Sequence, residues 1–163
     1  MLQDPPSKSF LTTIEFKLKL ERCQKRRCIS LYSMRTVVIN TMVNKPILIV
    51  DDEPIVRESI RDWLKASGYE VETADSGEAA MELVEKKDYS VVVMDVRLPG
   101  RTGISVLKDI KALKPQIKSI VITAYPSEEM SAEARKFGAV DYLIKPVNPD
   151  DLEKLINATI SMI

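Results

Sequence analysis

The chain contains 163 residues, with 24 basic side chains, 24 acidic side chains, no histidine and a hydrophobic share of 45%. This length and composition fit one globular domain with an appendage. Without histidine, the chain has no Ser-His-Asp or Cys-His catalytic arrangement and no phosphohistidine of its own. No apolar run approaches the roughly 20 residues of a membrane helix, and Cys23 and Cys28 lack further zinc ligands. We expect a cytoplasmic protein that does not enter the membrane.

The first 45 residues differ from the rest in charge. Residues 1–45 carry nine basic and three acidic groups, a formal charge of +6, whereas residues 46–163 carry −6. One interpretation makes residues 10–20 a strand, because hydrophobic and charged side chains alternate there with a period of two. The basic segment 22–27 could then contact nucleic acid or an acidic partner, but four basic residues in six make a modest patch, and we do not expect nucleic-acid binding.

The other interpretation, which we favour, gives this basic extension no function. Met42 lies a few residues before the apolar run at 46–50, and Met34 is an alternative start. Residues 1–45 are then either disordered or the product of an over-extended translation start.

From Pro46 onward, short apolar runs alternate with longer amphipathic stretches. The runs expected to form strands are residues 46–50, 69–74, 90–95, 118–123 and 139–144. The stretches expected to form helices are residues 53–68, 76–88, 102–115, 127–138 and 148–160. Ser76 and Ser127 occupy N-cap positions, and Gly68 and Gly138 occupy C-cap positions.

Five repeats of strand then helix predict an α/β fold, a doubly wound parallel sheet of five strands with helices on both faces. The valine-rich runs suit strands that are buried on both sides. In folds of this class, ligands bind at the carboxyl ends of the strands.

Polar side chains follow the apolar runs at those ends. They are Asp51-Asp52-Glu53 after the first run, Asp95 after the third, Thr123 after the fourth and Lys145-Pro146 after the fifth. Carboxylates gathered in one cleft repel each other and attract a hard cation with oxygen ligands, most commonly Mg2+. Asp95 could then act as a nucleophile toward a phosphoryl group, with Thr123 and Lys145 contacting the phosphoryl oxygens.

The stretches "ILIVDDEP", "VVVMDVRLPGRTG", "IVITAY" and "DYLIKP" occur in the order and spacing of the response-regulator receiver domain of two-component signalling. The chain resembles that family over residues 46–163. The resemblance implies a flavodoxin-like sheet of strand order 2-1-3-4-5 with five helices. Because this sequence ends at Ile163, about where the fifth helix should finish, we expect a stand-alone receiver of the chemotaxis or relay type.

The resemblance further implies a role for each matching residue. Asp95 corresponds to the phosphoacceptor, and Asp51, Asp52, Asp95 and the backbone carbonyl of Arg97 correspond to the Mg2+ ligands. Thr123 and Tyr142 match the switch pair, Lys145 matches the invariant lysine, and Lys145-Pro146 matches a peptide bond that is usually cis. Arg97 and Tyr125 occupy positions that tune the hydrolysis of the acyl phosphate in the family.

Several of these residues also have structural explanations. Asp51 and Asp52 could begin a helix, since Pro54 suits its first turn, and this is compatible with metal binding. Thr123 could simply favour a strand, and Tyr142 could belong to the core.

The functional prediction is a signalling switch and not an enzyme. Asp95 would take a phosphoryl group from a sensor histidine kinase or a histidine phosphotransfer protein, and the surface over residues 124–146 would change shape to control an unknown downstream protein. One alternative is a receiver fragment of a transcription regulator whose DNA-binding output domain has been lost. A phosphatase of the haloacid-dehalogenase class is another, but it needs an acid two positions after the nucleophile, where this chain has Arg97.

Overall fold

The computed structural model describes residues 45–162. The predictions for residues 1–44, including the strand at 10–20 and the basic segment, lie outside the described residues. The strands are β1 (Ile47–Val50), β2 (Val71–Ala74), β3 (Val91–Asp95), β4 (Lys118–Thr123) and β5 (Ala139–Ile144). The helices are α3 (Pro54–Ala66), α4 (Gly77–Lys86), α5 (Gly103–Leu113), α6 (Glu128–Lys136) and α7 (Pro149–Ile160).

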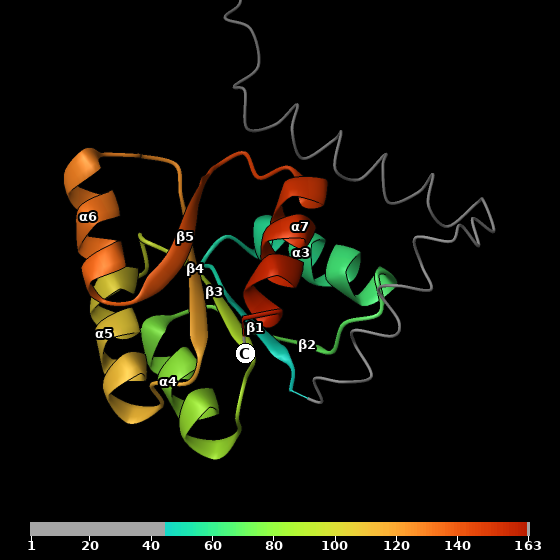
Figure 1. Ribbon diagram of the computed structural model, residues 1–163, viewed down its shortest axis with the longest axis horizontal. Coiled ribbons are helices and arrows are strands. Elements are labelled where there is room, and N and C mark those ends of the chain that lie inside the picture. The colour runs from blue at the N-terminus through green and yellow to red at the C-terminus, as the bar shows by residue number, and fades with distance from the viewer. Residues whose placement is uncertain (1–44, 163) are drawn as a thin grey trace, which may run out of the picture.

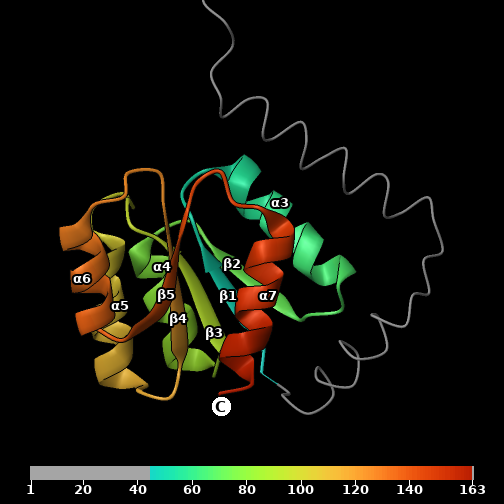
Figure 2. The same ribbon diagram turned by 45° about the horizontal axis from the view of Figure 1, so that its top comes forward.

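The five strands form one parallel sheet in the order β2-β1-β3-β4-β5, which confirms the predicted topology. Helices α4, α5 and α6 cover one face of this sheet, and α3 and α7 cover the other (Figures 1 and 2). Because all strands run in the same direction, the chain segments after β1, β3, β4 and β5 meet at one edge of the sheet.

The central strands are buried on both faces. Val91, Val92 and Val93 are at most 1% exposed, and Ile120, Val121 and Ile122 are at most 3% exposed. Alternate residues of β3 enter different cores: Val92 packs among α4 and α5 residues, and Val91 and Val93 pack among α3 and α7 residues. This apolar surface on both sides fixes the ends of β1 and β3, and therefore the positions of the carboxylates that follow them.

The helix ends follow the sequence predictions. The side chains of Ser76 and Ser127 accept hydrogen bonds from the backbone N–H groups of Ala79 and Met130, as N-caps do. Gly68 and Gly138 have φ angles of 93° and 88°, a backbone conformation that favours glycine.

Strand β2 begins two residues later than the apolar run at 69–74 predicted. The backbone N–H of Tyr69 donates to the carbonyl of Leu64, so Tyr69 closes the end of α3 instead of pairing with β1. Its ring is buried, and its hydroxyl donates to Asn157 Oδ1 on α7 at 2.6 Å. The packing of Tyr69 against α7 thus accounts for its place outside the strand.

Candidate phosphoryl and cation site

Three aspartates converge at the carboxyl edge of the sheet. Asp51 follows β1 and Asp95 ends β3, and both are buried, whereas the neighbouring Asp52 is exposed. One carboxylate oxygen from each lies within 4.8 Å of the others. Their positions confirm the prediction that these three residues come together at one edge of the sheet.

Lys145, which follows β5, brings an ammonium group into contact with this cluster. Its Nζ lies 2.8 Å from Asp51 Oδ2 and 2.5 Å from Asp95 Oδ2, and 3.2 Å from Glu53 Oε1. The Lys145 side chain is 10% exposed, so its charge lies largely out of water. One ammonium therefore forms ion pairs with two buried carboxylates.

The pKa shifts reflect this imbalance of charge. Burial raises the pKa of Asp51 above its ordinary 3.8 and the charge of Asp95 adds to the effect, although Lys145 acts in the opposite direction. Burial alone would lower the pKa of Lys145, but its hydrogen bonds to Asp51 and Asp95 and their charges raise it above 10.5. Lys145 is consequently charged at neutral pH.

The remaining predicted residues surround this cluster. Thr123 ends β4 and is buried, and its Oγ1 accepts a hydrogen bond from the backbone N–H of Tyr125 at 3.1 Å. The backbone N–H of Lys145 donates to the Thr123 carbonyl at 2.8 Å. The backbone N–H of Arg97 donates to Asp95 Oδ1 at 3.2 Å. The role of the Arg97 carbonyl as a ligand remains a prediction, as do the roles of Thr123 and Lys145.

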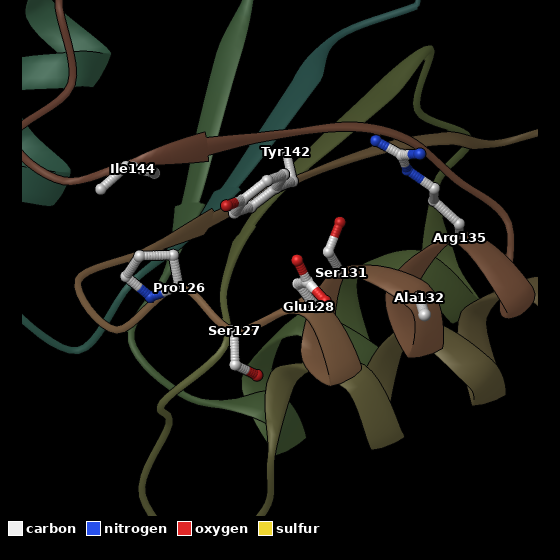
Figure 3. A pocket seen from close by; sticks show the side chains of 8 residues that line it. All are labelled: Pro126, Ser127, Glu128, Ser131, Ala132, Arg135, Tyr142 and Ile144. Carbon is white, nitrogen blue, oxygen red and sulfur yellow. The ribbon is translucent and has the colours of Figure 1, made fainter.

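Tyr142 lies on β5 and is half buried. Its ring projects over a groove of about 550 Å³ between β5 and α6, whose other lining residues are Pro126, Ser127, Glu128, Ser131, Ala132, Arg135 and Ile144 (Figure 3). Tyr142 also packs against the hydrophobic core on the α4–α6 side, so the core interpretation is partly correct. The Lys145–Pro146 peptide bond is cis, as the resemblance implied.

The residues of the cluster fit a divalent cation. Magnesium prefers oxygen ligands, and three carboxylates supply them. Lys145 balances one of the three negative charges, and a divalent cation has the charge to balance the other two. Asp52 is exposed, so the cluster is open to solvent on that side.

Comparisons with known proteins agree with this geometry. A family model described as the response regulator receiver domain matches residues 47–157. Sporulation initiation phosphotransferase F of Bacillus subtilis is 32% identical over 115 residues, which cover 71% of this chain and 93% of that protein. The chain belongs to the response regulator receiver family.

Two further relatives place this receiver domain in context. The crystal structure of a CheY-like receiver domain from Methanospirillum hungatei has a TM-score of 0.71 and 35% identity, and the match covers 72% of this chain and 94% of that one. The transcriptional regulatory protein ZraR of Escherichia coli K12 is 41% identical over 122 residues, or 72% of this chain. The match spans only 27% of the length of ZraR.

The family assignment bears on one alternative that the sequence left open, the phosphatase, and is compatible with the other, a receiver fragment of a transcription regulator. A receiver domain is a signalling module of two-component systems that accepts a phosphoryl group, and this favours the switch over the haloacid-dehalogenase alternative. None of the helices in residues 45–162 has both the length and the apolar character needed to cross a bilayer.

Two contacts of the receiver site were missed by the sequence prediction. The sequence places Glu53 in an acidic triplet and predicts no contact for it, but its carboxylate contacts Lys145. Arg57, one turn into α3, donates from its guanidinium to the Asp51 carbonyl at 2.7 Å. The sequence offered one sign of this contact. Arg57 lies in the first helix after the acidic triplet, and the first turn of that helix starts at the same edge of the sheet as Asp51.

Proposed function

We propose that Asp95 is the phosphoacceptor of a signalling switch. The proposal is supported chiefly by one observation: three carboxylate oxygens lie within 4.8 Å of each other, and Lys145 contacts the two buried carboxylates. In the proposed reaction, an Asp95 oxygen attacks the phosphorus of a phosphohistidine on a sensor histidine kinase or a histidine phosphotransfer protein. The P–N bond breaks, and the imidazole nitrogen keeps the electron pair and takes up a proton.

Asp51, Asp52 and Asp95, with the Arg97 carbonyl, are the proposed ligands of Mg2+. When bound, Mg2+ would reduce the repulsion between Asp95 and the incoming phosphoryl group. In the proposed site the ammonium of Lys145 pairs with an oxygen of the phosphoryl group, and its contact with Asp95 supports this role.

The proposed output is a change of the surface over residues 124–146. A phosphoryl group adds about −1.5 to −2 charge and strong hydrogen-bond acceptors to the cleft. Thr123 turns to donate to this group, and Tyr142 moves inward from the groove beside α6. The altered groove then binds an unknown downstream protein differently. We also propose that residues 46–163 form the receiver domain, that residues 1–45 are an appendage, and that the protein works in the cytoplasm.

The switch is tested by the backbone amide signals of residues 124–146. We expect these signals to shift when acetyl phosphate and Mg2+ are added to the wild-type protein, and to stay unchanged in Asp95→Asn under the same conditions. A protein that carries one phosphoryl group but shows the same 124–146 signals as the free form would contradict the switch while leaving the phosphoacceptor in place.

A second candidate function is favoured by the similarity to ZraR, a longer transcriptional regulatory protein. The same phosphorylation would then regulate a DNA-binding output region in a longer protein, or this sequence would be the receiver fragment of a regulator that has lost that region. The size of the native protein, measured in extracts with an antibody against the receiver domain, separates these cases from a stand-alone receiver.

A further inference from the structure

Arg97 and Tyr125 contact each other beside the carboxylate cluster. The guanidinium carbon of Arg97 lies 3.7 Å from the centroid of the Tyr125 ring, well within the distance of a cation–π interaction. Arg97 belongs to the loop between β3 and α5, and Tyr125 belongs to the loop between β4 and α6. The Tyr125 side chain is held in this stack although the residue is 57% exposed.

Each partner of the stack is bonded through its backbone to one side chain of the site. The N–H of Arg97 donates to Asp95 Oδ1 at 3.2 Å, and the N–H of Tyr125 donates to Thr123 Oγ1 at 3.1 Å. The stack therefore links two loops. One loop donates a backbone hydrogen bond to Asp95, and the other donates one to Thr123.

We propose that Arg97 and Tyr125 are positioning residues whose stack opposes the turn of Thr123 toward a phosphoryl group on Asp95. The stack fixes the loop after β4 in the arrangement in which the Tyr125 N–H reaches the Thr123 hydroxyl. A Thr123 rotamer directed at Asp95 gives up that hydrogen bond, so every restraint on the loop favours the resting arrangement. This inference rests on the proposed function of Asp95 and Thr123.

The exposure of Arg97 and Tyr125 sets the expected size of the effect of their stack on phosphoryl-analogue binding. Exposed cation–π contacts shift an equilibrium by about two- to fivefold. The stack should therefore weaken the binding of a phosphoryl analogue by that factor, without changing which residues contact the analogue.

The test measures the dissociation constant of beryllofluoride, a phosphoryl analogue, in the presence of Mg2+. We expect Tyr125→Leu to bind it about two- to fivefold more tightly than the wild type. Tyr125→Phe keeps the ring and serves as the matched control, with unchanged affinity. Arg97→Met removes the cation of the stack, so Tyr125→Leu should have a smaller effect in that background. Unchanged or weaker binding by Tyr125→Leu overturns the inference, as does an equal effect in both backgrounds.

A second measurement does not depend on the analogue. In the free protein without Mg2+, hydrogen exchange of the Tyr125 amide should be about two- to fivefold faster in Arg97→Met than in the wild type, because a neutral side chain makes no cation–π contact with the ring and the loop is no longer held. Equal exchange rates overturn the inference. Failure of the wild type to bind beryllofluoride would instead contradict the proposed function, and this inference with it.

Discussion

The ammonium nitrogen of Lys145 lies 2.5 Å from Oδ2 of Asp95, although 50 residues separate them in the chain. The parallel sheet causes this contact, because Asp95 ends β3 and Lys145 follows β5, with β4 between them. The same ammonium reaches Asp51 across the sheet. Removing it leaves two buried carboxylates without a cation.

We therefore expect Lys145→Met to lower the free energy of unfolding by about 3 kcal/mol without Mg2+, at the low end for a broken buried ion pair. Mg2+ should restore part of this loss, because the cation takes over the neutralisation of Asp51 and Asp95. Urea denaturation with and without Mg2+ measures both effects. Lys154→Met is the matched control: Lys154 pairs with Asp151 on the surface and its side chain is 74% exposed, so its loss should stay below about 1 kcal/mol. Equal losses in the two variants would contradict the assignment of Lys145.

Asp51→Asn tests the proposed cation site. The substitution removes one of three converging carboxylates, so the variant should lose the stabilisation that Mg2+ gives the wild type. That stabilisation is about 2.7 kcal/mol at a Mg2+ concentration 100 times the dissociation constant. Thermal or urea unfolding in a Mg2+ series measures it. Asp75→Asn, an exposed position just after β2, should keep the Mg2+ effect, and a variant at Asp51 that keeps it too would show that the cation binds elsewhere.

The stability of the fold should depend on pH through Glu72, which lies outside the aspartate cluster. Hydrogen bonds from Lys87 Nζ, at 2.6 Å, and from the Tyr89 hydroxyl lower the pKa of Glu72 below its ordinary 4.5. A lowered carboxyl pKa contributes stability that is present above pH 4.5 and is lost as the pH falls through the pKa of the folded state. Glu72→Gln should thus be less stable than the wild type at pH 6, and the gap should narrow below pH 4.5. A gap that is constant from pH 6 to pH 3 would contradict this role.

The sheet and most helix ends were predictable because they depend on local signals. Apolar runs such as 91–94 mark buried strands, and serine and glycine mark helix ends. The aspartate cluster was predictable because parallel strands bring their carboxyl ends together. Contacts between loops carry no periodic signal: the stack of Arg97 on Tyr125 and the reach of Arg57 to the Asp51 carbonyl depend on loop and side-chain conformation. The apolar run at 69–74 predicts a strand that includes Tyr69. The prediction is wrong for this residue because its contact with α7 is a tertiary contact that the local sequence does not indicate.

Gly103 allows the start of α5 to approach the end of β3 closely, next to the proposed phosphoacceptor. A Cβ at this position would lie 1.9 Å from the backbone oxygen of Asp95, too close for any side chain. Gly103→Ala must push the start of α5 away from β3, and we expect it to cost about 1–3 kcal/mol of stability and to slow the reaction with acetyl phosphate. Ala112→Gly, an exposed position on the same helix, should cost about 1 kcal/mol and leave that reaction unchanged. Wild-type phosphorylation in Gly103→Ala would contradict the role of this close approach.

The most direct test of the central claim is the intact mass of the protein after incubation with acetyl phosphate, with and without Mg2+. Wild-type protein should gain the mass of one phosphoryl group when Mg2+ is present, and this gain should disappear without Mg2+ and in Asp95→Asn. No gain under any condition, or the same gain in Asp95→Asn, would contradict Asp95 as the phosphoacceptor of this receiver domain.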